Sequence, residues 1–235
     1  MKISIVTPCF NSEKTLADTL QSILNQTYRD IEVIVVDGCS TDGTVAIVQL
    51  YESLFQGRMR WVSESDNGLY DAINKGIGLA TGQVVGILNS DDFFTSADVV
   101  EQVARSMEYT GQDAVYGDVH FVSGNDLQHV RRYYSSKVFR PFFLRFGFMP
   151  AHPSFYVRRE VYEKAGPYRT DFRIASDYEM MVRLFLKVGI KSKYLPIDFV
   201  TMRTGGLSTR NVNSRLTILK EDVRACRVNR IYYFL

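Results

Sequence analysis

Two adjacent carboxylates follow an apolar run near the middle of the chain. Residues 83–89, QVVGILN, have the composition of a buried strand, and Asp91 and Asp92 come just after it. Two carboxylates held together repel each other, and a cation relieves that repulsion. Mg²⁺ takes one or two protein carboxylates and completes its octahedron with water and phosphate oxygens. The pair is therefore a candidate site for a divalent metal and a diphosphate. The alternative is a plain strand end that caps the helix expected near Ser96.

Polar residues also follow the first two apolar segments of the chain. Residues 2–8 lead into Cys9, Phe10 and Asn11, and residues 31–37 end in Asp37, before Gly38. In an open parallel sheet, ligands bind in the crevice at the carboxyl ends of the strands. If these strands are neighbours, Asp37 and the acid pair share one edge of the sheet. Taken alone, Asp37 is equally consistent with an Asx turn.

The elements that must position these residues alternate in type along the first half. Short β-branched runs at 2–8, 31–37, 59–64 and 83–89 predict strands, and helix-period segments lie between and after them, at 11–26, 40–55, 69–80 and 96–108. This alternation is typical of an α/β protein with a mostly parallel central sheet flanked by helices. The second half predicts a mixed sheet, with strands at 113–122, 129–134 and 154–157 and a helix over 176–189.

Length and composition favour a single globular unit. The chain has 235 residues, 46% of them apolar, with no Pro, Gly or Ser-rich linker, so we expect one domain over 1–207 and a basic helical tail over 208–235. No stretch predicts a membrane span or a signal peptide. The three cysteines match neither a disulfide framework nor a zinc site, which favours a cytoplasmic location.

The formal net charge of +2 hides two basic segments. The stretch 131–148, RRYYSSKVFRPFFLRFGF, contains five basic residues and no acid, and the chain beyond 202 is also basic. Aromatic residues among cations suit base stacking, but no RNA-binding motif is present, and we expect no nucleic acid. Two interpretations stay open: peripheral contact with an anionic membrane through 131–148 and the tail, or a pocket wall and core packing with a solvated basic edge.

Five motifs, taken together and in order, resemble the family 2 glycosyltransferases. They are VTPCFN (6–11), VVDGCSTDGT (35–44), ESDNGLYDAINKGIGLATG (64–82), LNSDD (88–92) and ASDYEMMVRL (175–184). The resemblance runs from about residue 2 to about residue 207. It implies the GT-A nucleotide-diphospho-sugar transferase fold and an inverting enzyme of the bacterial polysaccharide type.

The resemblance implies a donor site built from the first half. Pro8, Phe10 and Asp37 would hold the base and ribose, although Gly38 replaces an acid that many members carry. Asp66, Asp71 and Asn74 would close over the diphosphate, with Lys75 as a weaker candidate. Asn89 replaces the first acid of the metal motif and, with Asp91, would meet the ribose. Asp92 would ligate the metal, with Asp91 as a second candidate ligand. These implied site residues are Pro8, Phe10, Asp37, Asp66, Asp71, Asn74, Asn89, Asp91 and Asp92.

The resemblance also implies a reacting acid in the second half. Asp177 matches the general base, and Ser176 replaces the acid that often precedes it. Its alternative role is a helix N-cap. His152 and Arg203 are candidates for the acceptor or diphosphate site, and Arg203 begins a loop through Gly206 that would lie over the site.

These residues predict a metal-dependent inverting glycosyltransferase using Mn²⁺ or Mg²⁺. It would move a sugar from a nucleoside-diphosphate sugar, UDP-linked by preference, to a saccharide or lipid-linked saccharide in cell-surface polysaccharide synthesis. One rival is a catalytically silent nucleotide-sugar-binding module. The other is a sugar nucleotidyltransferase, which would need a glycine-rich basic loop that the segment after the first strand lacks.

Overall fold

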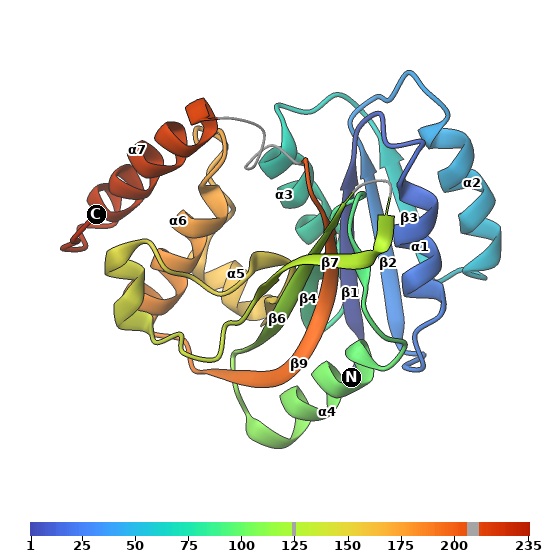
Figure 1. Ribbon diagram of the computed structural model, residues 1–235. Helices are drawn as coiled ribbons and strands as arrows, with labels where there is room; N and C mark the ends of the chain where they lie inside the picture. Colours follow the sequence, from blue (N-terminus) through green and yellow to red (C-terminus); the bar gives the residue numbers. More distant parts are fainter. Residues whose placement is uncertain (124–125, 206–211) are drawn as a thin grey trace.

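A computed structural model describes residues 1–123, 126–205 and 212–235 (Figure 1). The first half builds a parallel sheet in the order β3-β2-β1-β4. Its strands are β1 (Ile3–Cys9), β2 (Ile31–Asp37), β3 (Met59–Ser63) and β4 (Val84–Ile87). Every residue of β1 and β2 is buried, because helices cover both faces of a parallel sheet. The predicted parallel arrangement is confirmed.

Alternating side chains of the strands supply two cores, one on each face of the sheet. Ile5 of β1 packs with α1, α2 and α4, whereas Val6 packs with α3 and with the helices of the second half. The helices of the first half are α1 (Leu16–Leu24), α2 (Thr44–Leu54), α3 (Leu69–Leu79) and α4 (Val99–Thr110). Figure 1 shows α1 and α2 on one side of the sheet and α3 on the other.

The second half continues the same sheet with mixed pairing, as predicted. Beyond β4 the order is β8-β6-β9-β5, and β7 pairs with β6. The bounds are β5 (Phe93–Phe94), β6 (Ala114–Ser123), β7 (Asp126–Tyr134), β8 (Tyr156–Arg158) and β9 (Ser192–Arg203). Sequence reasoning missed β5 and β9. β9 contains Pro196 and several charged residues, so it lacks the apolar run that revealed the other strands.

Short helices and one long helix complete the second half. They are η1 (Pro141–Phe146), η2 (His152–Ser154), α5 (Arg159–Ala165), α6 (Ser176–Val182), η3 (Arg183–Val188) and α7 (Val212–Val228). The predicted helix over 176–189 is present as α6 followed by η3, a π-helix. Ala225 and Cys226 of α7 are buried in the same core as α6. The division at residue 207 stays a prediction, and residues 208–211 lie outside the described part of the chain. Among the described residues, no helix has both the length and the apolar character needed to cross a bilayer.

Candidate active site

The ends of β1, β2 and β4 lie side by side, and this places the predicted donor residues along one edge of the sheet. In the register, Cys9 is opposite Asp37 and Val6 is opposite Ile87. The amide of Gly38 donates to the carbonyl of Cys9 at 2.9 Å, which joins the loops after β1 and β2. The acids after β2 and β4 therefore share one edge, as the sequence predicts.

Asp37 is fully buried and holds its own loop together. Its carboxylate accepts from the amide of Ser40 at 3.1 Å and from the hydroxyl of Ser63 at 2.6 Å. Burial and the Asp37 charge raise the pKa of the neighbouring Cys9 thiol. Asp37 therefore stabilises the turn after β2, through the amide three residues further on and not through the two-residue spacing of an Asx turn.

Phe10, Gly38 and Asp66 meet at the mouth of this edge. A Cβ placed on Gly38 would lie 2.6 Å from Oδ2 of Asp66 and 3.4 Å from the Phe10 ring. The missing side chain at Gly38 thus leaves room for the Asp66 carboxylate. Asp66 therefore places an acid next to position 38, where many family members carry an acid of their own. The Phe10 ring is 61% exposed and available for stacking. Pro8 lies within β1 and is buried.

The residues at the start of α3 have mainly local partners. The carboxylate of Asp71 accepts from the amide of Asn67 at 2.9 Å. Asn74 binds the main chain of Tyr168 at both of its amide atoms, at 2.7 and 2.8 Å. Lys75 pairs with Glu64 at 3.0 Å. Asn74 therefore ties α3 to the second half of the chain, whereas Asp71 keeps its loop in place beside the donor edge.

Asp92 is buried and Asp91 is partly buried at the end of β4. The pKa of Asp92 is raised well above its usual value by burial and by the charge of Asp91. Burial also raises the pKa of Asp91. The hydroxyl of Thr19 on α1 donates to the carbonyl of Asp92 at 2.7 Å and fixes this turn. Neither acid caps α4, whose N-cap is Asp98.

His152 connects the acid pair to the acid of the second half. Its Nδ1 lies 3.3 Å from Oδ2 of Asp177, and its Nε2 lies 3.4 Å from Nδ2 of Asn89. Nδ2 of Asn89 also donates to Oδ2 of Asp92 at 3.3 Å. A neutral imidazole protonated at Nδ1 satisfies all of these contacts, because it donates to Asp177 and accepts from Asn89. Asp177, His152, Asn89 and Asp92 thus form one continuous polar chain.

Asp177 is the second residue of α6 and does not cap it. The N-cap of α6 is Ala175, and no side-chain cap bond is present there. The hydroxyl of Tyr70 on α3 lies 3.5 Å from Oδ1 of Asp177, and burial and this acid raise the pKa of the tyrosine well above its usual value. The Asp177 carboxylate is 15% exposed. Oδ1 of Asp177 accepts from the amide of Tyr178 at 2.9 Å, and the hydroxyl of Tyr70 also donates to the carbonyl of Ile174. Asp177 is therefore oriented by His152 and by this amide, and the alternative N-cap role does not hold because Ala175 is the N-cap.

Glu221 of α7 holds the segment in front of α6, a role that sequence reasoning missed. Its two carboxylate oxygens accept from the backbone amides of Arg173, Ile174 and Ala175 at 2.7, 2.9 and 2.9 Å. Next to it, Asp222 is buried, and burial together with the charges of Asp177 and Glu221 raises its pKa to about 7. The only signal in the sequence was that Glu221 and Asp222 are the sole acids in a basic tail.

Arg203 lies beneath the acid pair and does not face solvent. Its side chain is 7% exposed, donates to the carbonyl of Asp91 at 2.7 Å and pairs with Asp18 of α1. Its guanidinium also lies over the Phe93 ring, 5.1 Å from the centroid. Arg203 therefore supports the backbone at Asp91. Gly206, at the far end of the predicted loop, lies outside the described residues.

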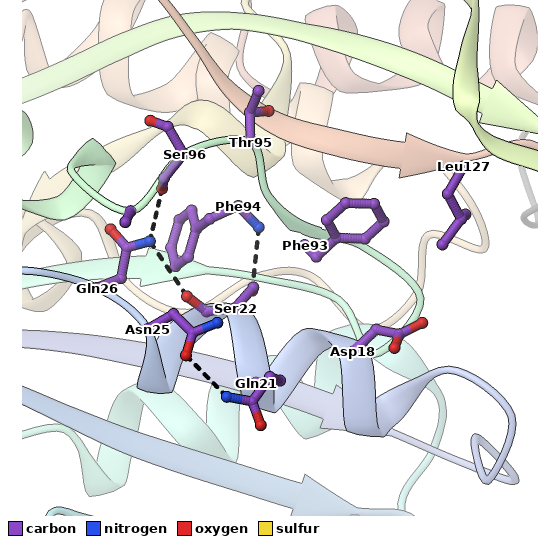
Figure 2. A pocket seen from close by; sticks show the side chains of 11 residues that line it. Asp18, Gln21, Ser22, Asn25, Gln26, Phe93, Phe94, Thr95, Ser96 and Leu127 are labelled. Atoms are coloured by element: carbon purple, nitrogen blue, oxygen red, sulfur yellow. Dashed lines mark hydrogen bonds between the residues drawn. The ribbon is translucent and has the colours of Figure 1, made fainter.

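A cavity of about 380 Å³ lies beside this arginine, between α1 and the segment 93–97 (Figure 2). Most of its polar side chains bond within its own wall. Gln26 donates to the carbonyls of Ser22 and Ser96, and the hydroxyl of Ser22 accepts from the amide of Phe94. The cavity contains none of the predicted site residues, so the candidate active site is the open edge of the sheet. In the described part of the chain, no three His, Cys, Asp or Glu side chains form a metal site by themselves.

Comparisons with known proteins identify the family. Residues 4–166 match the family described as glycosyl transferase family 2. A PGL/p-HBAD biosynthesis glycosyltransferase of Mycobacterium tuberculosis is 32% identical over 212 residues, which cover 89% of this chain and 80% of that protein. A putative teichuronic acid biosynthesis glycosyltransferase, TuaG of Bacillus subtilis, is 36% identical over 106 residues, 45% of this chain and 42% of that protein.

Solved structures share the fold at low sequence identity. TarS of S. aureus in complex with UDP superposes with a TM-score of 0.73 at 19% identity, covering 100% of this chain and 67% of that one. The mannosyltransferase PcManGT of Pyrobaculum calidifontis, in complex with GDP-Man and Mn²⁺, gives 0.71 at 20% identity, covering 96% and 64%. These likenesses show the GT-A fold. With the family match over more than half of its length, the chain belongs to glycosyl transferase family 2 and is a glycosyltransferase.

Proposed function

We propose that this glycosyltransferase is an inverting, metal-dependent enzyme in which Asp177 is the general base. The observation that carries the proposal is the polar chain from Asp177 through His152 and Asn89 to Asp92. Only two side chains, those of His152 and Asn89, lie between Asp177 in the second half and Asp92 of the acid pair that would hold the donor. A direct displacement needs this arrangement, with a base on the acceptor side and a held leaving group opposite.

The donor in this proposal is a nucleoside-diphosphate sugar bound along the edge formed by β1, β2 and β4. Phe10 and Asp66 would contact the base, and the loop held by Asp37 would form the wall beside the ribose. The exposed Phe10 ring and the space at Gly38 support this assignment. We propose UDP as the nucleotide because the resemblance favours it. The UDP complex of TarS and the GDP-Man complex of PcManGT define the two donors to compare first.

The residues at the end of β4 fit a divalent cation. Oδ1 of Asn89 is buried and has no hydrogen-bond partner among the described residues. Asp92 is a buried carboxylate whose charge is disfavoured by Asp91, so a cation would stabilise its ionised form. Oxygen donors of this kind suit Mg²⁺ or Mn²⁺, with substrate phosphates completing the shell. Asp92 would be the main ligand, with Asp91 and Asn89 beside it. The bound ion would neutralise charge on the departing diphosphate.

Asp177 would take the proton of the acceptor hydroxyl as that oxygen attacks the anomeric carbon. Its Oδ2 lies 3.3 Å from Nδ1 of His152 and its Oδ1 accepts from the amide of Tyr178 at 2.9 Å, so the carboxylate is kept in a fixed orientation. Holding the base in place lowers the entropic cost of reaction. The acceptor in this proposal is a saccharide or a lipid-linked saccharide used in cell-surface polysaccharide synthesis at the cytoplasmic face of the membrane.

A donor screen with product analysis tests the proposal. Purified protein is incubated with UDP-glucose, UDP-N-acetylglucosamine, UDP-galactose or GDP-mannose, with Mn²⁺ or with EDTA. We expect slow, metal-dependent release of the nucleoside diphosphate from one of them. With methanol added as a small acceptor, NMR of the methyl glycoside, which does not mutarotate, should show an inverted anomeric carbon. Retained configuration would contradict the inverting mechanism. Pyrophosphate release from UTP and a sugar phosphate would instead support the nucleotidyltransferase rival, and binding without turnover would support the silent module.

A further inference from the structure

The structure joins the two basic segments of the sequence into one surface. Phe146 of η1 stacks on Phe234 near the end of the chain, with ring centroids 4.7 Å apart. The amide of Phe234 donates to the carbonyl of Arg145, and the guanidinium of Arg145 donates to the carbonyl of Tyr232, both at 2.7 Å. Figure 1 shows the red end of the chain on the same side of the molecule as this segment. Residues far apart in sequence thus form a common face.

Five exposed aromatic side chains form a continuous row on this face. Phe142 contacts Phe143 and Phe146, Phe146 stacks on Phe234, and Phe234 contacts Tyr232. The exposed fractions run from 38% to 71%. We call these residues the aromatic row: Phe142, Phe143, Phe146, Tyr232 and Phe234. Neighbouring Phe139 and Leu144 are buried, so the segment divides into an inner side that packs in the core and an outer side that does not. Core packing therefore does not account for the row.

Basic residues flank the aromatic row. Lys137 and Arg140 are exposed just before Phe142 in the sequence, and Arg227 and Arg230 are exposed just before Tyr232. The guanidinium of Arg227 lies 5.8 Å from the centroid of the Tyr233 ring, next to the row. Neither 131–148 nor 223–235 contains an acid. Apolar rings inside a basic rim are the features of a protein surface that inserts shallowly into an anionic bilayer. A second protein copy would bring the same positive charge to this face, which disfavours self-association.

We infer that the aromatic row and its basic rim form a docking surface for an anionic lipid bilayer. The rings would enter the headgroup region, and Lys137, Arg140, Arg227 and Arg230 would meet lipid phosphates. The surface lies close to the proposed base, because the hydroxyl of Tyr178, the residue after Asp177, donates to the carbonyl of Leu144 in η1. Docking would therefore bring the acceptor side of the site to a lipid-linked substrate. This last consequence rests on the proposed function, whereas binding to the bilayer does not.

Vesicle flotation tests the inference without any use of activity. The protein is mixed with vesicles of phosphatidylcholine and phosphatidylglycerol, or of phosphatidylcholine alone, at low and high salt. We expect flotation with the anionic vesicles only, weakened by salt. Because each basic residue near such a surface strengthens binding about fivefold, loss of two cations weakens it about 25-fold. The Lys137→Glu/Arg140→Glu variant should therefore bind at least about 25-fold more weakly, since its two new negative charges are also repelled. The Phe142→Ser/Phe146→Ser variant should lose at least about tenfold.

Matched controls separate docking from folding and from general charge. Arg29→Glu changes an exposed cation between α1 and β2, and Tyr109→Ser removes an aromatic ring that is 87% exposed on α4. Arg29→Glu should weaken binding far less than a single charge reversal at Lys137 or Arg140 does, and Tyr109→Ser should leave binding unchanged. All variants should keep the wild-type melting temperature within a few degrees. Absence of flotation, or flotation unaffected by the Phe142 and Phe146 changes, would overturn the inference. A wild-type dimer in light scattering that these changes convert to a monomer would also overturn it, in favour of a second copy as occupant.

Discussion

The half of the chain that we propose binds the donor (the donor half) and the half that we propose supplies the base (the acceptor half) are built in different ways. In the donor half, parallel strands end at one edge, and the candidate acids Asp37 and Asp92 lie within a few positions of a strand end. In the acceptor half, Asp177 contacts His152 of η2, and the segment before α6 is held by Tyr70 of α3 and by Glu221, more than forty residues away. The donor site is thus local to the topology of the sheet, whereas the acceptor side depends on long-range contacts.

This difference predicts that binding and chemistry can be separated by mutation. Changes in the donor half should weaken nucleotide and metal binding. Changes in the acceptor half should slow turnover or loosen the packing around the base while donor binding persists.

The largest expected effect is that of Asp177→Asn. The amide cannot accept the acceptor proton, so nucleoside diphosphate release should fall by about 10²-fold or more. Steady-state kinetics at saturating donor measure the change. Asp222→Asn is the matched control, because it neutralises another buried acid near α6 that the proposal does not use. Comparable rates for Asp177→Asn and wild type would remove Asp177 from the mechanism.

The next effect is that of Asp92→Asn on donor binding. Loss of the main metal ligand should weaken metal-dependent binding of the donor by about tenfold or more, since outer and inner ligands of a metal site each contribute on that scale. The unliganded protein should not lose stability. Burial and the charge of Asp91 disfavour the ionised form of Asp92, and asparagine carries no charge at that position. Thermal shift with and without Mn²⁺ measures both quantities. Asp126→Asn, on β7, is the control, and an unchanged shift for Asp92→Asn would contradict the assignment.

A smaller effect is expected from Glu221→Ala. Three backbone amides lose their acceptor, which should lower the free energy of unfolding by about 2 kcal/mol and the rate by about tenfold, with donor affinity kept. Denaturant melts and kinetics measure these changes. The exposed neighbour Lys220→Ala serves as control. Glu221→Gln keeps one oxygen acceptor and should recover part of the loss, and no difference between the alanine and glutamine variants would speak against this contact.

The smallest effect concerns the pH dependence of stability and Asp222. Its pKa is about 7 in the folded protein and near its ordinary value of about 3.9 in the unfolded chain. The folded state therefore holds the proton more tightly, and stability falls as pH rises from about 4 through about 7. Asp222→Asn should lose this dependence, melting several degrees above wild type at pH 8 but close to it at pH 5. Parallel melting curves across this range would contradict a buried, protonated Asp222.

Sequence reasoning correctly placed the candidate residues that lie at the ends of strands. Asp37, Asp91 and Asp92 lie where the apolar runs predicted them. A buried strand and the point where it ends can both be recognised from the residues of that segment alone. Sequence reasoning could not find β9, whose sequence is broken by Pro196, or the contact of Glu221 with the segment before α6, because that contact depends on how α7 packs. It also left an N-cap role open as the alternative for Asp177, since a helix start shifted by one or two residues is not visible in sequence.

The most direct test of the account is calorimetric titration of UDP, in the presence of Mn²⁺, into wild type, Asp177→Asn and Asp92→Asn. The account predicts that Asp177→Asn binds UDP with wild-type affinity, whereas Asp92→Asn binds at least about tenfold more weakly. Weak binding by Asp177→Asn together with unchanged binding by Asp92→Asn would contradict it.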